Sequence, residues 1–543
     1  RASPSDRADR GRCPLNMRAG WGRRAAMACA IALLLLAAVA GGQRVPTPPP
    51  AGYMDYQLRP GYRFSAPLCD DDEGQPAPAL IRLGLIHPFS SVIVQAAVQN
   101  FGITGLSVEN VGDLAKDAVR LLAMDLVQSF NADNKAGLKV EIDVLPIDST
   151  VGGAFQTSAE LIFGDVNNEL IGIVGGQTQD NSLSIQFVSQ SFSLPHVSWG
   201  ATDNVFGDLV RFPYFVRTAG TQTQMFHAAA ALLRHLNVTR VVLFTSPELY
   251  TGYPIDVDSI MASTGVEVPY KASIGRNPSV REFDTIINAV RASNVNYIYV
   301  GIVYGSPLLA LLDRNRERGN IVSADTVFIL GDQELYQAMP MIMTLTRLNI
   351  DIPQGLRFAP TYIENDVADT YRTIRVNNTV WFGMYDRQAD WTDWMTKNRR
   401  AADPALFPGL ASYSNDFEAF IPPDAMFPSM IPAVVDPILA YLHAAEAMVA
   451  AGRGCFLNGP ARNGSLLHDT IKNLVFNGST GYVDFDPATG DRHCPYTAKS
   501  IRFWDGQSEG KSFDPDDKVL VWSPLHGIQE RGGTFYWPDG TST

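Results

Sequence analysis

The residues best suited to hold a ligand form a short polar run between two apolar segments. A buried-strand pattern at residues 170–174 stops at a Gly-Gly pair, and the polar run that follows contains Thr178, Asn181 and Ser182. Apolar residues then return at helical spacing, which predicts a strand, a tight turn and the first turn of a helix. In an open α/β sheet such a turn lies at the carboxyl edge, where free backbone N–H groups and the helix dipole can meet a ligand.

A second turn would supply a hydroxyl at the same edge. The next strand pattern, residues 194–199, ends in Gly-Ala-Thr, which places Ala201 and Thr202 just beyond the strand. Two adjacent turns would then form one ligand-binding floor. Capping is the alternative role of the first turn, because Thr, Asp, Asn and Ser all favour the start of a helix. A single threonine in a turn can likewise be purely structural.

Strand and helix patterns alternate along most of the chain. The strand patterns occupy residues 138–147, 170–174, 194–199, 240–245, 266–270, 297–303 and 326–330, and the helix patterns occupy residues 113–130, 155–163, 225–236, 256–263, 280–292, 308–318 and 431–451. Strict alternation predicts parallel sheets with helices on both faces. Two consecutive sets of this kind predict an α/β fold with two doubly wound, Rossmann-like lobes.

The composition limits the classes of function. With 543 residues, of which 46% are hydrophobic, the chain is long enough for two or three domains. Its net charge of −13 argues against a nucleic-acid or anionic-membrane partner, because phosphate-binding surfaces need clustered Lys and Arg. The sequence has no GxSxG, HExxH, P-loop or GxGxxG motif, so we expect neither catalysis nor a cofactor.

Two features could suggest a metal site, and both have a simpler explanation. The eight histidines are scattered without metal-ligand spacing, and we expect His87, His196 and His227 to be hydrogen-bonded residues of the core or rim. The carboxylates within residues 484–491 lack the ligand spacing and terminal Glu of an EF-hand loop. A hairpin turn is therefore the better interpretation of that segment.

Residues 17–40 indicate export from the cell. Arginines precede an apolar run that ends in Ala-Val-Ala, which is the layout of a secretory signal peptide with a small-residue cleavage site. A retained membrane anchor is the alternative, although the uninterrupted run is short for a span of about 20 residues. Residues 41–78 are rich in Pro and Gly, which predicts a disordered leader without a core of its own.

Three cysteines remain once a signal peptide is removed: Cys69, Cys455 and Cys494. They allow one bridge and one remaining thiol. We predict a disulfide between Cys455 and Cys494, because both flank the same late segment, and a Cys69 that is free or joins two chains. Sequons for N-glycosylation, which fit an exported surface, occur at Asn237, Asn377, Asn463 and Asn477.

The order of several motifs resembles a known family. GIVGG with its polar helix start, LPHVSWGATDNVFGD and FPYFVRT resemble the extracellular ligand-binding region of class C G-protein-coupled receptors and natriuretic-type receptors. The similarity runs from about residue 81 to residue 504. It implies the periplasmic-binding-protein type I fold, in which three crossings of the chain form a hinge between two lobes.

The resemblance also implies where each lobe lies in the sequence. Lobe one would comprise residues 79–218 and 356–480, and lobe two residues 219–355 and 481–505, followed by a strand and turn extension at residues 506–543. The three crossings would lie near Thr218, Phe358 and Gly481.

Three residues of lobe two match ligand contacts of the family. Tyr250 matches an aromatic residue that closes over the ligand, and Asp332 matches an acid that pairs with a ligand amine, with Tyr304 on the same rim. A packing tyrosine and a helix N-cap are the alternatives for Tyr250 and Asp332. Asp180 departs from the family, because an aspartate at the positive end of a helix dipole would repel the carboxylate of an α-amino acid.

Together these observations predict an exported small-molecule-binding domain, the extracellular part of a membrane receptor that signals by clamshell closure. The ligand would be an amino acid, an amine or a similar compound. The domain could form a homodimer, and a segment after Thr543 would attach it to the membrane. A secreted solute-binding protein that serves a transporter is one alternative, and an adhesion or scaffold domain without a ligand is another.

Overall fold

The fold is built on two large β-sheets that follow one another in the sequence. A computed structural model of the chain describes residues 55–69, 80–88, 108–133, 137–147, 151–176, 178–246, 255–275, 277–301, 307, 310–311, 314–315, 327–330, 362–363, 374–375, 379–383, 433–494, 496–500 and 519–531.

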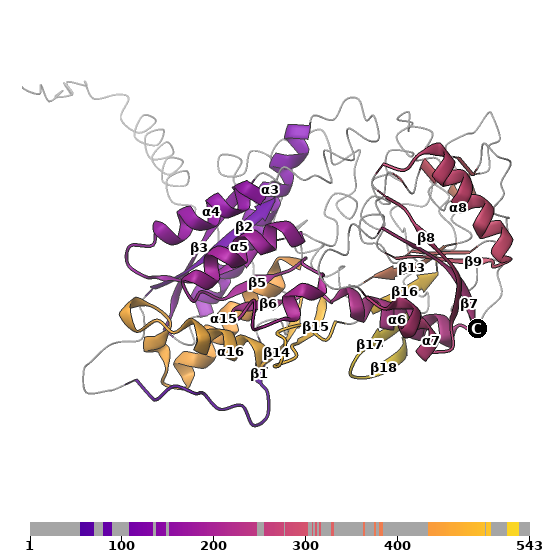
Figure 1. Ribbon diagram of the computed structural model, residues 1–543. Helices are drawn as coiled ribbons and strands as arrows, with labels where there is room; N and C mark the ends of the chain where they lie inside the picture. Colours follow the sequence, from indigo (N-terminus) through magenta and orange to yellow (C-terminus); the bar gives the residue numbers. More distant parts are fainter. Residues whose placement is uncertain are drawn as a thin grey trace, which may run out of the picture. The chain divides into compact units, whose positions relative to one another are not determined.

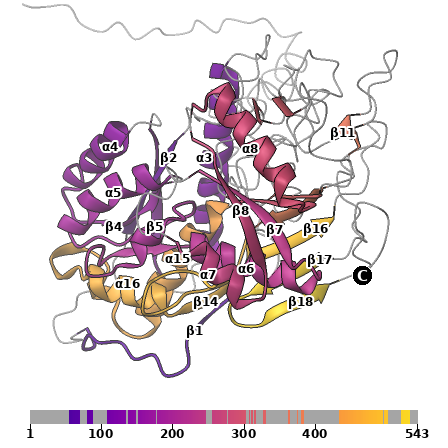
Figure 2. The same ribbon diagram turned by 45° about the vertical axis from the view of Figure 1, so that its right-hand side comes forward.

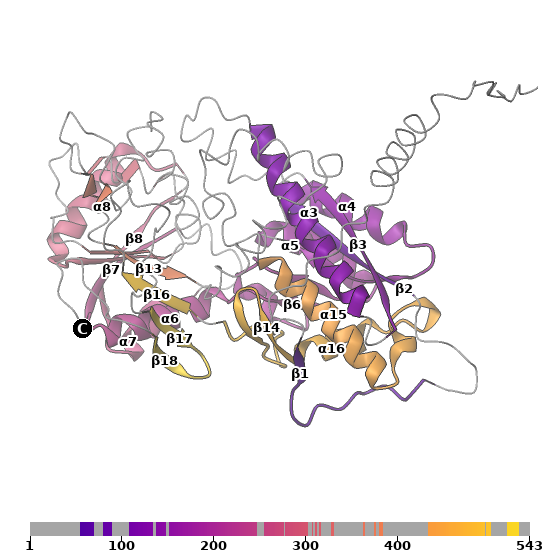
Figure 3. The ribbon, with the colours of Figure 1, turned by 180° about the vertical axis from the view of Figure 1, so that it is seen from behind.

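The first sheet has five parallel strands in the order β3-β2-β4-β5-β6. The strands are β2 (Leu80–Pro88), β3 (Lys139–Ile147), β4 (Leu170–Gly175), β5 (His196–Ser198) and β6 (Phe215–Arg217). Its helices are α3 (Val108–Asp133), α4 (Val151–Phe163), α5 (Gln179–Ser191), α15 (Val435–Ala450) and α16 (Gly464–Lys472). Figure 1 shows α4 and α5 in front of this sheet, and the view from behind in Figure 3 brings α3 and α15 forward, so both faces are covered.

Two glycines let helices approach this sheet closely. A Cβ atom at Gly84 on β2 would collide with Leu161 of α4, and one at Gly172 on β4 would collide with the ring of Tyr441 of α15. Tyr441 uses this approach to donate its hydroxyl to the carbonyl of Pro195 at 2.6 Å. An alanine at either glycine would therefore push a helix away from its face of the sheet.

The second sheet has eight strands in the order β18-β17-β16-β13-β10-β9-β7-β8. They are β7 (Arg240–Thr245), β8 (Glu267–Ser273), β9 (Tyr297–Val300), β10 (Val327–Leu330), β13 (Thr379–Gly383), β16 (Tyr496–Ser500), β17 (Val519–Ser523) and β18 (Gly527–Arg531). The strands from β8 to β13 are parallel, whereas β16, β17 and β18 are added in antiparallel fashion. Helices α6 (Gln222–His235), α7 (Val257–Ser263) and α8 (Val280–Ser293) accompany this sheet, as Figure 2 shows.

Smaller elements complete the described part of the chain. A three-stranded sheet contains β1 (Tyr56–Leu58), β14 (Leu474–Gly478) and β15 (Gly481–Asp484), and a two-stranded sheet contains β11 (Tyr362–Ile363) and β12 (Ile374–Arg375). Single 3-10 turns are η2 (Asn204–Gly207), η5 (Gly454–Phe456) and η6 (Gly459–Ala461). Among the described helices, none is both long enough and apolar enough to cross a membrane.

The predicted α/β class with parallel sheets is confirmed, but two predicted segment assignments are wrong. Strand β13 pairs with β10 and β16, so residues 356–480 do not all return to the first sheet. Strand β15 pairs with β14 and buries Val483 in the core of the first sheet, so the predicted lobe-two segment 481–505 begins too early. Within residues 506–543, predicted as a strand and turn extension, β17 and β18 are joined by a turn and add to the second sheet. Periodicity locates a strand in the sequence, but it does not identify the strand's partner.

Part of the predicted disordered leader, residues 41–78, is regular structure. Strand β1 pairs with β14 in antiparallel fashion, and Tyr56 stacks on the ring of His443 with 4.9 Å between centroids. Arg59 forms an ion pair with Asp484. The described leader residues therefore pack on the return segment instead of extending into solvent.

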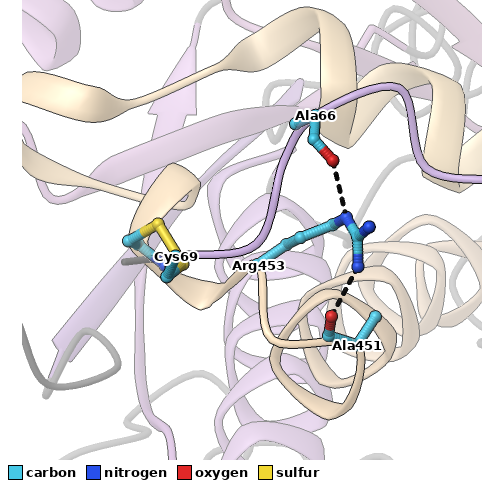
Figure 4. Close-up of a disulfide and its surroundings, with 5 residues drawn as sticks. Ala66, Cys69, Ala451 and Arg453 are labelled. Atoms are coloured by element: carbon cyan, nitrogen blue, oxygen red, sulfur yellow. Dashed lines mark hydrogen bonds between the residues drawn. A yellow bond between two sulfur atoms is a disulfide. The ribbon is translucent and has the colours of Figure 1, made fainter. Parts of the chain in front are cut away.

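The predicted Cys455–Cys494 disulfide is wrong, because Cys455 is bonded to Cys69. The leader runs beside η5, where the Arg453 guanidinium donates to the Ala66 carbonyl at 3.0 Å, as the close-up in Figure 4 shows. Cys494 instead lies in the core of the second sheet, where burial raises the pKa of its thiol to about 11. Cys455 and Cys494 are near in sequence but belong to different parts of the fold.

We expect Cys69→Ser to lower the free energy of unfolding by about 2–4 kcal/mol, because the bridge joins residues 386 apart and restricts the unfolded chain. Urea unfolding of the intact chain, with and without dithiothreitol, is the measurement. Dithiothreitol should lower the wild-type midpoint and leave that of Cys69→Ser unchanged. Peptide mapping without reduction should link Cys69 to Cys455 in both wild type and Cys494→Ser. A Cys455–Cys494 peptide would contradict the assignment.

Candidate functional site

The first turn of the candidate site joins β4 to α5. Gly176 takes a left-handed conformation with φ of 74°, and a Cβ atom there would collide with Ser182. Thr178 is the N-cap of α5, and its hydroxyl accepts from the Asn181 N–H at 3.3 Å. Thr178 therefore has the capping role that the sequence allowed, while its exposed side chain stays at the helix start.

Two buried serines fasten the first turn to the second. Ser198, the last residue of β5, donates its hydroxyl to the Gly176 carbonyl at 2.6 Å, and Ser182 donates to the same oxygen at 3.1 Å. The Ser198 oxygen also accepts from the Ala201 N–H at 3.1 Å. The two predicted turns are thus adjacent. Sequence reasoning missed Ser198, although its place at a strand end, like that of Thr202, was a usable signal.

Asn181 is the least satisfied polar side chain of the first turn. Its side chain is 1% exposed, and within the described part of the chain neither its carboxamide nitrogen nor its oxygen has a hydrogen-bond partner. A buried polar atom without a partner costs about 1–3 kcal/mol. Such groups are uncommon in folded proteins and call for an explanation.

The second turn is held by both backbone and side-chain hydrogen bonds. The Thr202 carbonyl accepts from the Gln222 N–H at 2.9 Å, and the Asp203 carboxylate accepts from the Val205 N–H at 2.8 Å, which caps η2. Ala201 is completely buried, whereas Thr202 is only half-buried. The Thr202 hydroxyl is therefore the group of this turn that could reach another molecule.

A buried histidine forms a hydrogen bond to the residue before the first turn. His196 at the start of β5 is completely buried, with its two ring nitrogens 3.1 Å from the Gly175 carbonyl and 3.1 Å from the Gln186 side-chain oxygen. Burial lowers the pKa of His196 to about 4, against a smaller opposing effect of the Gly175 carbonyl. The ring is therefore neutral at pH 7. The expectation that His196 is a hydrogen-bonded core residue is confirmed.

The residues predicted in lobe two lie outside the described ranges. Tyr250, Tyr304 and Asp332 are in this group, and so is Asn377 among the sequons. The strands that precede Tyr304 and Asp332, β9 and β10, are hydrogen-bonded neighbours with parallel register. Their carboxyl ends therefore meet at one edge of the second sheet.

The remaining predicted surface and metal features fall within the described part. Asn237 and Asn477 are exposed, whereas Asn463 is half-buried and its side-chain oxygen accepts from the Leu466 N–H as the N-cap of α16. Residues 484–491 form the predicted hairpin turn, closed by an antiparallel bridge from Phe485 to Arg492. Within the described ranges, no group of three or more His, Cys, Asp or Glu side chains is arranged to hold a metal ion.

We expect the buried His196 to lower the free energy of unfolding as the pH is lowered. The unfolded state, with an ordinary histidine pKa near 6.5, binds a proton more readily than the buried ring, so stability is lost as the pH falls from about 6.5 toward 4. The loss should reach about 2–3 kcal/mol between pH 7 and pH 4.5. Urea midpoints at both values measure it.

His196→Gln should shrink this difference, even if the variant is less stable at both pH values. The matched control is His227→Gln on the exposed side of α6, which should keep the wild-type difference between the two pH values. If wild type and His196→Gln lose the same stability between pH 7 and pH 4.5, His196 is excluded as the cause.

Known proteins match the chain over long segments. The profile of a family described as "Receptor family ligand binding region" matches residues 119–497. Glutamate receptor 3.4 of Arabidopsis thaliana is 27% identical over 186 residues, which is 34% of this chain and 19% of that protein. This chain therefore spans about a fifth of the length of that relative.

Solved structures of solute-binding proteins also match the chain. An ABC-transporter solute-binding protein of R. palustris in complex with 4-hydroxybenzoate has 15% identity and a TM-score of 0.47, covering 79% of this chain and 94% of its own. The branched-chain amino acid transporter substrate-binding protein LivJ of Streptococcus pneumoniae, in complex with isoleucine, has 14% identity and a TM-score of 0.48. The match covers 82% of this chain and 100% of LivJ.

Proposed function

Because this chain belongs to the receptor family ligand-binding region, we propose that it is the extracellular ligand-binding domain of a membrane receptor related to class C G-protein-coupled receptors. The domain would be exported by the signal peptide at residues 17–40 and glycosylated at its exposed sequons. It would signal by binding and conformational change, without catalysis.

The buried amide of Asn181 is the observation that carries this proposal. It lies in the first turn of α5, at the positive end of the helix dipole. Its carboxamide can both donate and accept, yet both functions are unused within the described part of the chain. A small polar ligand at the two fastened turns would supply the missing partners.

The proposed ligand is an amino acid, an amine or a similar compound. Asp180 is exposed in the first turn of α5, where its charge offsets the helix dipole and disfavours a ligand carboxylate. This favours an amine. The Arabidopsis relative is named as a glutamate receptor, which supports testing amino acids as well.

Closure of two lobes around the ligand is the proposed signal. The lobe-one floor would contain Thr178, Asn181, Ser182, Ala201 and Thr202, and lobe two would contribute Tyr250, Tyr304 and Asp332. Moving an equilibrium from mostly open to mostly closed needs about 5 kcal/mol of preference for the closed form. A ligand can supply this preference only if both halves of the site contact it.

A thermal-shift screen of amino acids, amines, nucleosides and small organic acids tests ligand binding, because a bound ligand raises apparent stability. For a compound that binds, Thr202→Val and Asp332→Asn should each weaken the affinity about tenfold or more by calorimetry, the loss of about one hydrogen bond. Thr285→Val on the exposed face of α8 is the matched control and should bind like wild type. Unchanged affinity in both site variants would exclude the proposed cleft.

Two alternatives differ from the receptor in measurable ways. A secreted solute-binding protein for a transporter would bind ligand equally well but appear in the medium of expressing cells instead of at their surface. An adhesion or scaffold domain would show no thermal shift with any compound. Surface labelling and the ligand screen therefore separate the three functions.

We further propose that two copies pair through α4 and α5, which Figures 1 and 2 show side by side. Four aromatic side chains of these helices and the α5 C-cap are exposed: Phe155, Phe163, Phe187 and Phe192. Glu160 and Asp180 are the only charged residues in the two helices. A nearly uncharged aromatic face suits a second copy of itself, because two such faces meet without like-charge repulsion.

Phe163→Asp should raise the dimer dissociation constant about 30-fold or more, since it places a charge in an aromatic interface. Sedimentation velocity over a range of concentrations is the measurement. Val280→Asp on α8 is the control, because it places the same charge at another exposed apolar residue: Val280 is 57% exposed and Phe163 is 72% exposed. The Val280→Asp variant should associate like wild type. A wild-type chain that stays monomeric at all concentrations would refute the pairing.

A further inference from the structure

Arg217 joins the second turn of the candidate site to the segment that leads into the second sheet. It is the last residue of β6 and is completely buried. Its Nη1 donates to the carbonyls of Ala201 at 2.9 Å and Asp203 at 2.5 Å, and its Nε donates to the Asp491 carboxylate at 2.6 Å. One side chain therefore holds both ends of the turn and the start of the connection.

The backbone strengthens the link between these segments. Arg217 and Asp491 form an isolated parallel bridge, with the Arg217 N–H donating to the Gly490 carbonyl at 3.2 Å. The next residue pair is joined as well, because the Arg492 guanidinium donates to the Thr218 carbonyl at 3.0 Å. A displacement of one segment at this point must therefore displace the other.

The guanidinium of Arg217 is not fully satisfied in this conformation. Within the described part of the chain, its Nη2 is buried without a hydrogen-bond partner. A buried cationic donor without an acceptor is costly, so the present arrangement does not give Arg217 all the bonds it can make. Such a buried donor is uncommon in a folded protein and calls for an explanation.

We infer that Arg217 is a positioning residue that couples the turn at residues 201–203 to the connection at residues 490–492. It holds the Thr202 turn in place through two carbonyls and passes any movement of that turn to Asp491. This inference rests on the proposed function only in regarding the turn as part of the ligand floor. The coupling itself is a property of the ligand-free protein.

Hydrogen exchange on the intact ligand-free chain tests the coupling. Arg217→Lys keeps the charge, but a single ammonium cannot replace a fork that bonds two carbonyls and a carboxylate. Exchange in peptides covering residues 198–206 should quicken about tenfold or more, the loss of one or more charge-assisted hydrogen bonds. The quickening should extend to residues 485–492 across the bridge.

Arg462→Lys is the matched control. Arg462 donates to the Leu170 carbonyl at 2.9 Å and to the Asp165 carboxylate at 3.4 Å, so it also joins a carbonyl to a carboxylate, but at the amino end of β4. Its substitution should quicken exchange around residues 165–170 and leave residues 198–206 at the wild-type rate. A general loss of stability would instead affect both segments in both variants.

A double-mutant cycle separates coupling from two independent effects. Asp491→Asn alone should quicken exchange in residues 198–206, although among the described residues the bonds from Asp491 reach that turn only through Arg217. The double variant Arg217→Lys/Asp491→Asn should exchange no faster there than Arg217→Lys alone, because residues that act through one link are not additive. Additive rates, or an unchanged turn in Asp491→Asn, would overturn the inference while leaving ligand binding intact. Failure of every compound to bind would remove the proposed function and leave the exchange result standing.

Discussion

The structure depends on one buried ion pair, between Asp436 at the start of α15 and Arg492 before β16. Both side chains are completely buried, with 3.4 Å between the guanidinium and the carboxylate. The Asp436 carboxylate also accepts from the Ser479 N–H, the Ser479 hydroxyl and the Thr480 hydroxyl. Burial raises the pKa of Asp436, whereas Arg492 and these donors act in the opposite direction. A buried pair is tolerable only when its remaining bonds are satisfied in this way.

This ion pair determines where the returning chain can go. It fixes the start of α15, the turn between β14 and β15, and the segment that carries Arg492 into the second sheet. Gly478 is required at this point, because a Cβ atom there would collide with the Asp436 carboxylate. Two arginines join the neighbouring segments in opposite directions. Arg217 donates to the Asp491 carboxylate, and Arg492 donates to the Thr218 carbonyl while it is paired with Asp436. Directional charged bonds thus hold the connection.

Most of the elements could be predicted from the sequence, and the family resemblance drawn from the motif order is confirmed. The expected helix at residues 280–292 is α8 at Val280–Ser293, for example, because a capping box of Ser279 and Glu282 marks its start locally. Long-range partners could not be predicted. Cys69 and Cys455 are 386 residues apart, and nothing in the spacing of three cysteines favours them. Likewise, β17 has the pattern of a short strand, but only the fold shows that it pairs with β16.

The candidate site was predictable in position but not in its internal bonding. The two turns follow from strand ends, yet the roles of Ser182 and Ser198 depend on which groups meet across them. The buried face of α5 includes Ser182, Gln186 and Ser189, so this helix packs partly through hydrogen bonds where most helices pack through apolar side chains. Gln186 meets His196, and Ser182 meets Ser198. Hydrogen bonds fix direction as well as distance, so the start of α5 is held in a defined orientation, while the Asn181 carboxamide has no partner among the described residues. That combination gives a rigid floor with an unused polar group, which is the arrangement a small polar ligand needs.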